Sequence, residues 1–150
     1  MKVAIALGSN LGDRERYLND ALAALEPFVK SLHVSSFHAT APVGVGAQPT
    51  FLNAAAVGET SLSARQLLDR MLEIETRLGR ERPFAGAPRT LDLDLILYAD
   101  EILDEPGLVV PHPRFRARRF VLEPLAEIAG DWRDPVTGRT VEELLRMLVS

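Results

Sequence analysis

In the first sixty residues, short runs of apolar residues alternate with a stretch in which apolar residues have the spacing of a helix. Residues 3–7 form an apolar run that ends at Gly8, Ser9 and Asn10, which indicates a buried strand followed by a tight turn. Asp13 can cap a helix whose apolar positions recur every three or four residues, up to Leu25. The same reasoning predicts strands over residues 33–38 and 51–57, separated by a loop rich in proline and glycine.

The rest of the chain contains a second amphipathic helix and further short elements. Ser63 begins the helix and Gly79 ends it, residues 81–88 form another loop, and residues 90–98 form a fourth strand. A short edge at 108–110, a partly helical stretch at 116–128 and a helix at 141–148 follow. This order predicts an α+β fold in one domain, residues 1–150. We expect a ferredoxin-like βαββαβ antiparallel sheet with helices on one face and C-terminal helical additions.

Two aspartates in the fourth strand carry the strongest chemical signal. Residues two apart on a strand point to the same face, so Asp92 and Asp94 lie together while Leu91, Leu93, Leu95 and Leu97 point into the core. Two neighbouring carboxylates repel unless a cation lies between them, and Mg²⁺ favours one or two carboxylates together with phosphate oxygens. A polar, solvent-facing strand without a ligand is the alternative, although aspartate is a poor strand former.

Arginine supplies 15 of the 17 basic residues, and seven of these lie between Arg80 and Arg119. The planar guanidinium grips phosphate with two hydrogen bonds, so this cluster favours a site for dispersed negative charge. His112, held between two prolines, could donate to such a phosphate. Scattered surface ion pairs and an ordinary loop histidine are the alternatives. The turn at Gly8 lacks the lysine and the serine or threonine that complete a Walker loop, so a nucleotide would need another kind of site.

Composition and net charge argue against some classes of function. The net charge is −4, which argues against general nucleic-acid binding, and the chain has no cysteine for disulfides or thiolate metal sites. No leader pattern and no apolar run long enough to span a membrane are evident. We therefore expect a cytoplasmic protein. No partner is evident, and a monomer is expected.

At three blocks the sequence resembles the 6-hydroxymethyl-7,8-dihydropterin pyrophosphokinase family of folate biosynthesis. The blocks begin at Gly86, Val110 and Gln48, and read GAPRTLDLD, VPHPR and QPTFLNAA. The resemblance extends from residue 4 to about residue 129. It implies a transferase that moves pyrophosphate from ATP to the pterin hydroxymethyl group and releases AMP, with two Mg²⁺ ions.

The resemblance also implies roles for individual residues. It assigns both metal ions to Asp92 and Asp94, which would form the catalytic set with three arginines, Arg80, Arg82 and Arg89. The expected ATP contacts are these arginines together with Glu75, His112 and Arg118. The pterin ring would stack between Phe51 and Phe120. Its edge would meet Asn53 and the backbone of Thr40, Ala41 and Val43.

The sequence departs from the family pattern in places, and other functions stay open. Phe51 stands where a tyrosine is sometimes found, the loop at 81–87 is short and lacks a tryptophan, and Gly107 replaces an arginine of some members. The loops at 43–50 and 81–88 could close over the substrates. A regulatory ligand-binding domain, an RNA-binding module and a kinase that transfers only the γ-phosphoryl group are the alternatives.

Overall fold

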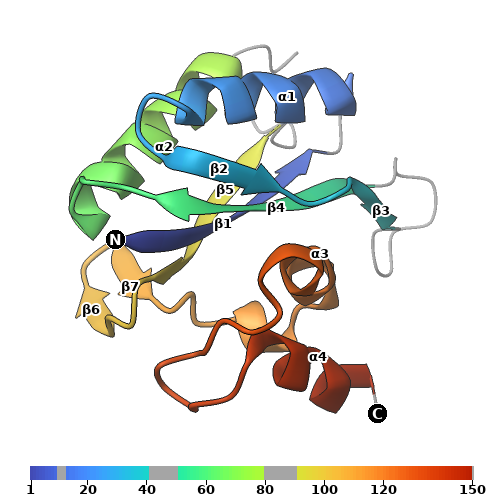
Figure 1. Ribbon diagram of the computed structural model, residues 1–150. Coiled ribbons are helices and arrows are strands. Elements are labelled where there is room, and N and C mark those ends of the chain that lie inside the picture. Colours follow the sequence, from blue (N-terminus) through green and yellow to red (C-terminus); the bar gives the residue numbers. More distant parts are fainter. Residues whose placement is uncertain (10–12, 41–50, 80–90, 150) are drawn as a thin grey trace.

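The computed structural model describes residues 1–9, 13–40, 51–79 and 91–149, and an antiparallel sheet forms its centre (Figure 1). Strands β1 (Lys2–Ser9) and β4 (Phe51–Glu59) lie in the middle of the sheet, and β5 (Asp92–Tyr98) pairs with the other side of β1. Strands β2 (Lys30–Val34) and β3 (His38–Thr40) both pair with β4. The strand order is β2–β4–β1–β5, and neighbouring strands are antiparallel throughout.

Helices cover both faces of the sheet (Figure 1). Helices α1 (Arg14–Leu25) and α2 (Ala64–Leu78) lie on one face. The 3-10 turn η1 (Phe115–Ala117) and helices α3 (Arg119–Ala129) and α4 (Val141–Val149) lie on the other. The prediction of an antiparallel sheet with helices is confirmed. No helix within the described ranges has the length and apolar character that a membrane crossing requires.

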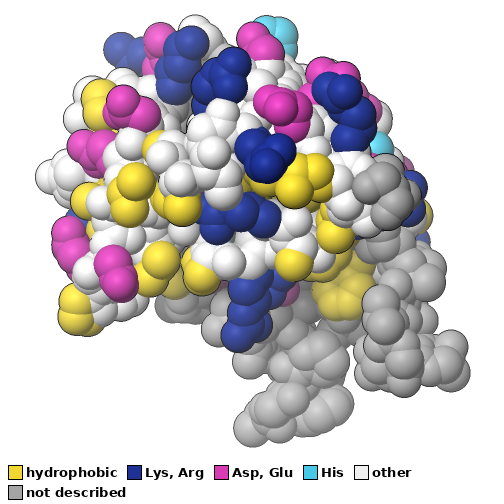
Figure 2. Space-filling model, turned by 90° about the horizontal axis from the view of Figure 1, so that it is seen from below, with side chains coloured by type: hydrophobic (Ala, Val, Ile, Leu, Met, Phe, Trp, Pro, Cys, Tyr) yellow, Lys and Arg dark blue, Asp and Glu magenta, His cyan; other side chains and the backbone are white. Residues whose placement is uncertain are grey.

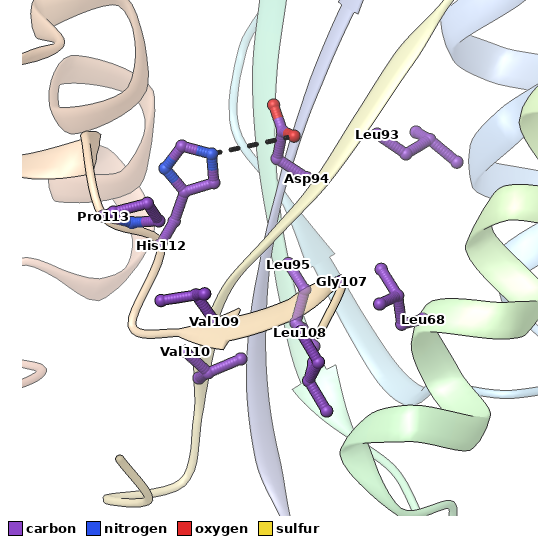
Figure 3. Close-up of a pocket in the computed structure, with 10 residues that line it drawn as sticks. All are labelled: Leu68, Leu93, Asp94, Leu95, Gly107, Leu108, Val109, Val110, His112 and Pro113. Atoms are coloured by element: carbon purple, nitrogen blue, oxygen red, sulfur yellow. Dashed lines mark ion pairs between the residues drawn. The ribbon is translucent and has the colours of Figure 1, made fainter. Parts of the chain in front are cut away.

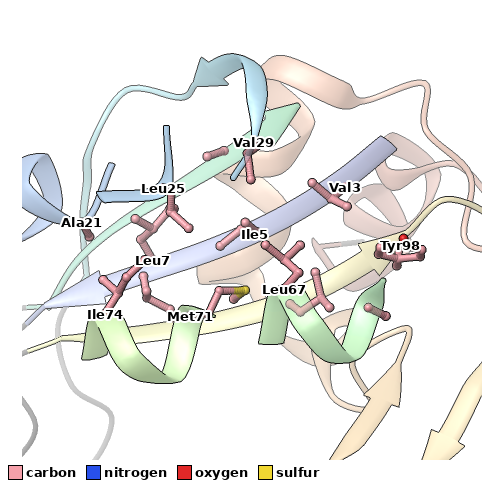
Figure 4. Close-up of a cluster of buried hydrophobic side chains, with 14 of the residues drawn as sticks. Val3, Ile5, Leu7, Ala21, Leu25, Val29, Leu67, Met71, Ile74 and Tyr98 are labelled. Carbon is pink, nitrogen blue, oxygen red and sulfur yellow. The ribbon is translucent and has the colours of Figure 1, made fainter. Parts of the chain in front are cut away.

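Each face of the sheet has its own hydrophobic core. The core under α1 and α2 contains Val3, Ile5, Leu7, Leu67, Met71 and Ile74 (Figure 4). The core under α3 and α4 contains Ala4, Ala6, Ala55, Phe115, Leu122 and Leu125. The sequence-based placement of Leu97 beside Leu93 and Leu95 is wrong, because Leu97 belongs to the second core. The pairing of β1 with β5 shifts register between Ala4 and Ile5, and this shift turns Leu97 to the other face.

The helix starts predicted from sequence are confirmed by their caps. The Asp13 carboxylate accepts from the backbone N–H of Arg16 at 3.1 Å. Ser63 and Gln66 form a reciprocal capping box, each side chain accepting from the other residue's backbone N–H. The backbone N–H of Gly79 closes the last turn on the Glu75 carbonyl at 2.7 Å.

One strand prediction was wrong in detail, and one short strand was not predicted. The strand expected over residues 33–38 is two strands, because Ser35 interrupts the ladder: its Oγ accepts from the backbone N–H of Ala55 at 2.9 Å. The edge at 108–110 is confirmed as β7 (Leu108–Val110), but it pairs with β6 (Leu103–Glu105), which was not predicted. The predicted loops at 43–50 and 81–88 lie outside the described residues.

Candidate active site

One row of side chains crosses the middle of the sheet and contains the first aspartate. Gly8 of β1 lies opposite Asn53 of β4 on one side and opposite Asp92 of β5 on the other. Directly paired residues point to the same face. Because neighbouring strands are about 4.8 Å apart, Asn53 and Asp92 begin about 10 Å apart with only a glycine between them.

The next row contains the second aspartate. Ala6 of β1 lies opposite Ala55 of β4 and opposite Asp94 of β5, on the face that α3 covers. The middle of this face therefore carries only Gly8 and small alanines. A Cβ atom on Gly8 would come within 3.1 Å of Asn53 Oδ1, so glycine is what lets the Asn53 carboxamide lie over β1. In these two rows, no bulky side chain of β1 stands between Asn53 and the aspartates.

The two carboxylates fit the coordination chemistry of Mg²⁺. Both are partly exposed, with 41% of the Asp94 side chain accessible, and they share a face as predicted. Within the described ranges, no three His, Cys, Asp or Glu side chains gather closely enough to hold a metal ion. Two carboxylates completed by water and phosphate oxygens are a usual Mg²⁺ environment. The donor set therefore fits this ion when an anionic ligand is also present.

His112 lies beside Asp94 and is held by backbone contacts. Its backbone N–H donates to the Ile96 carbonyl at 3.0 Å, and its Nε2 lies 3.9 Å from Asp94 Oδ1 (Figure 3). Its Nδ1 accepts from the backbone N–H of Arg114 at 3.1 Å, so the neutral ring carries its proton on Nε2. Burial lowers the pKa of His112, Asp94 opposes that shift, and Arg118 and Arg114 add to it. A neutral N–H donor therefore faces the aspartates.

A pocket of about 250 Å³ opens next to this pair (Figure 3). Its apolar wall consists of Leu68, Leu93, Leu95, Leu108, Val109 and Val110. Asp94 and His112 lie at one side of the pocket, and Gly107 and Pro113 complete its lining. Such a pocket suits a flat, weakly polar group that is attached to an anionic one.

Glu75 of α2 fixes the strand that carries the aspartates. Its Oε2 accepts from the backbone N–H of Leu93 at 2.7 Å, and Leu93 lies between Asp92 and Asp94. In the described sheet β5 is the last strand, so this N–H has no ladder partner on that side. The Glu75 carboxylate, from the helix layer, accepts this hydrogen bond where a further strand would otherwise do so. The family resemblance implies only a nucleotide contact for Glu75, and its contact with β5 was not predicted.

This contact predicts faster amide exchange in a Glu75→Ala variant. A hydrogen bond to a charged group contributes about 1.5 kcal/mol or more, so the Leu93 amide should exchange at least about tenfold faster without it. Hydrogen exchange followed by NMR measures this directly. Glu73→Ala is the matched control, because Glu73 is on the same helix and pairs only with Arg70 at 3.1 Å among the contacts described. Equal Leu93 exchange in both variants would show that Glu75 does not hold the strand.

The other predicted site residues lie on the same side of the sheet where they are described. Phe51 precedes Asn53 by two positions on β4, so the two share a face. Phe120, 41% exposed, lies in the first turn of α3, and the Arg118 guanidinium lies 5.5 Å from its ring centroid. The Thr40 backbone pairs with Phe51. Five further predicted residues lie outside the described ranges: Arg80, Arg82, Arg89, Ala41 and Val43.

Basic side chains gather on the face that α3 and α4 form. Figure 2 views this side from below and shows Lys and Arg side chains both in its middle and along its upper edge, where acidic side chains lie beside them. Arg114, Arg116, Arg118 and Arg119 come from one short segment between β7 and α3. Arg116 pairs with Asp134 and Arg119 pairs with Glu123, so among the described contacts Arg114 and Arg118 remain to raise the local concentration of anions.

Comparison with known proteins identifies the relatives of this chain. Residues 4–130 match the family described as 7,8-dihydro-6-hydroxymethylpterin-pyrophosphokinase (HPPK). The chain is 49% identical over 141 residues to the 2-amino-4-hydroxy-6-hydroxymethyldihydropteridine pyrophosphokinase of Bacillus subtilis, covering 93% of this chain and 84% of that protein. The protein of the same name from Pseudomonas aeruginosa is 43% identical over 146 residues, covering 96% and 90%.

The fold also matches a solved structure. Wild-type Plasmodium falciparum HPPK-DHPS superposes with a TM-score of 0.79 at 13% identity. The match covers 99% of this chain and 44% of that longer one. At this identity the likeness concerns the fold alone.

Proposed function

Since the chain belongs to the 7,8-dihydro-6-hydroxymethylpterin-pyrophosphokinase family, we propose that it transfers pyrophosphate from ATP to 6-hydroxymethyl-7,8-dihydropterin and releases AMP, a step of folate biosynthesis. One observation supports this reaction above others. The row from Asn53 through Gly8 to Asp92 puts a buried amide and a carboxylate on one face, about 10 Å apart.

The metal side of the site consists of Asp92 and Asp94. Their carboxylates would hold two Mg²⁺ ions together with the phosphate oxygens of ATP. When bound, these ions neutralise charge on the triphosphate and polarise the phosphorus–oxygen bonds. The protein's own part is to keep the two carboxylates on one face, and the Glu75 contact with the Leu93 N–H supports that placement.

The nucleotide side is the pocket beside Asp94. Its aliphatic wall suits the adenine ring, and the Nε2–H of His112 faces the position that phosphates would take near Asp94. The positively charged side chain of Arg118 would bind the same phosphates, as would those of Arg80, Arg82 and Arg89. Gly107 lines the pocket without a side chain, so a cationic contact available to some relatives is missing at this position.

The pterin side lies around Asn53. The buried carboxamide can hydrogen-bond the edge of the ring, and Phe51 and Phe120 would cover its two faces. The backbone of Thr40, Ala41 and Val43 would complete the edge. This arrangement directs the hydroxymethyl group towards the aspartates across Gly8.

The proposed reaction is an in-line displacement at the β-phosphorus. The hydroxymethyl oxygen forms a bond to the β-phosphorus, the bond from that phosphorus to the oxygen bridging the α-phosphorus breaks, and AMP leaves with that oxygen. The hydroxyl proton is released during the step. Positioning and charge neutralisation supply most of the acceleration, as is usual in phosphoryl transfer.

The remaining expectations belong to the same proposal. The order β2–β4–β1–β5, with helices α1 and α2 as crossovers, supports a ferredoxin-like plan in which β3 is an added edge segment. A single domain, a cytoplasmic location and a monomeric state stay predictions.

The test is product analysis with purified protein, ATP, Mg²⁺ and the hydroxymethyl-dihydropterin. We expect AMP and the pterin diphosphate in equal amounts, and no turnover when a chelator removes Mg²⁺. ADP as the product would favour a γ-phosphoryl kinase instead. Binding of both ligands without any product would favour a regulatory ligand-binding domain.

Gly8→Ala should weaken pterin binding selectively. The added methyl group would press on Asn53 Oδ1 at 3.1 Å and displace the carboxamide, so we expect the KM for the pterin to rise about five- to tenfold. Steady-state kinetics measure this, and the KM for ATP is the internal reference. Gly130→Ala is the matched control, since its Cβ would meet the Ala126 carbonyl at 3.0 Å, far along α3. Equal effects on both KM values would contradict the assignment of Asn53.

A further inference from the structure

The segment between β7 and α3 is anchored from the C-terminal side of the molecule. This segment, residues 112–120, contains His112, Arg114, Arg118 and Phe120, and η1 is at its middle. Phe115 points into the second core and is fully buried. Its neighbour Arg116 reaches Asp134, which lies in the turn between α3 and α4.

The contact between Arg116 and Asp134 is a two-pronged, largely buried ion pair. Arg116 Nε donates to Asp134 Oδ2 at 2.5 Å, and Arg116 Nη2 donates to Oδ1 at 2.9 Å. The Asp134 side chain has no exposed surface, and the guanidinium carbon of Arg116 lies 4.9 Å from the Phe115 ring centroid. A planar guanidinium bound this way fixes direction as well as distance.

The carboxylate of Asp134 is itself held rigidly. Its Oδ1 accepts from the backbone N–H of Val136 at 3.0 Å, and its Oδ2 accepts from Thr137 Oγ1 at 2.7 Å. Residues 134 and 139 also pair through their backbones at 2.8 Å. The turn therefore offers a preformed, fully oriented acceptor to the arginine segment.

We propose that the Arg116–Asp134 pair is a positioning device for pyrophosphoryl transfer, which holds residues 112–120 so that His112 and Arg118 meet the triphosphate. Arg116 itself is bound to Asp134 and acts through its neighbours. The backbone of the segment transmits the constraint: the Arg118 N–H donates to the Phe115 carbonyl at 3.2 Å, and the Arg114 N–H donates to His112 Nδ1. This inference rests on the proposed function, because it assigns His112 and Arg118 to the triphosphate.

The experiment compares Arg116→Gln and Arg116→Lys with Thr137→Val, all at a temperature where circular dichroism shows each variant folded. Thr137→Val removes a hydrogen bond to the same carboxylate and leaves the arginine contact intact. We expect the KM for ATP to rise about tenfold or more in Arg116→Gln and less in Arg116→Lys, since a small displacement of phosphate-binding groups has large kinetic effects. Thr137→Val should stay within about twofold of wild type, because both Arg116 contacts and the Val136 N–H still orient the Asp134 carboxylate.

Amide exchange provides a readout that does not need substrate. Residues 112–120 should exchange faster in Arg116→Gln and Arg116→Lys than in Thr137→Val, while β1 and β4 stay unchanged. Unaltered kinetics in folded Arg116→Gln would overturn the inference, and so would equal losses in the arginine variants and Thr137→Val. If Arg116→Gln does not fold, the kinetics and amide exchange of Arg116→Lys test the inference in its place. Absence of AMP formation by the wild-type protein would instead contradict the proposed function.

Discussion

Replacing Asp94 by alanine should abolish nearly all AMP formation while the protein stays folded. The side chain is 41% exposed on the α3 face and supports no core contact, so its removal leaves the packing intact. Loss of one of the two carboxylates proposed to hold Mg²⁺ would remove several kcal/mol of charge stabilisation, and kcat/KM should fall by about 10³-fold or more. A coupled assay for AMP and a thermal melt measure the two effects.

Asp100→Ala is the matched control for this variant. Asp100 is exposed in the turn that follows β5, so it tests the loss of an acidic residue near the same strand without touching the site. Its activity should remain within about twofold of wild type. Near-normal turnover in Asp94→Ala would remove the metal assignment, whereas a large fall in melting temperature would show that Asp94 has a structural role.

The second large effect concerns stability. Asp134→Asn should lower the free energy of unfolding by about 3 kcal/mol or more, because it leaves the Arg116 guanidinium without its anionic partner in a largely buried site. Chemical denaturation at neutral pH measures the change. Asp131→Ala, an exposed acidic residue in the same turn, should change stability by less than about 0.5 kcal/mol. Similar losses in both variants would indicate that the turn as a whole, rather than the ion pair, is responsible.

The same pair predicts how stability depends on acid. Burial opposes ionisation of Asp134, but hydrogen bonds from Arg116, Thr137 and Val136 and the Arg116 charge outweigh it, and the pKa of Asp134 lies below its usual value. The contribution is therefore complete above the unfolded-state pKa of about 4, and it is lost as the pH falls through the lower pKa of the folded protein. The stability difference between wild type and Asp134→Asn should shrink over that acidic range. A difference that stays constant down to pH 2 would contradict the lowered pKa.

Much of the fold could be predicted because its signals are local. The caps at Asp13 and Ser63 act within three residues, and the alternation around Asp92 and Asp94 is visible in seven consecutive positions. Local patterns of this kind decide where an element begins and which face a side chain takes. The aspartate pair, the candidate site's strongest feature, was predicted for this reason.

The features that sequence reasoning missed depend on contacts between distant parts of the chain. Glu127 on α3 accepts from the backbone N–H and the hydroxyl of Ser36, which lies 91 positions earlier. Arg116 and Asp134 meet across 18 positions, and Glu75 meets Leu93 across the same separation. The spacing of residues along the sequence does not predict such contacts, because each contact depends on how α2 or α3 packs on the sheet. The isolated polar residues looked like ordinary surface residues in the sequence.

The glycine at the centre of the sheet has a consequence for substrate range. Main-chain ladders on either side of β1 set the spacing between Asn53 and Asp92, so the distance between the Cα atoms of these two residues is a property of the backbone. We infer that a pterin whose hydroxyl group is joined to the ring by a longer carbon chain would place its hydroxyl oxygen beyond the reacting phosphorus. A rotamer change at Asn53 or Asp92 moves only the end of that side chain, while the two ladders keep the Cα spacing fixed.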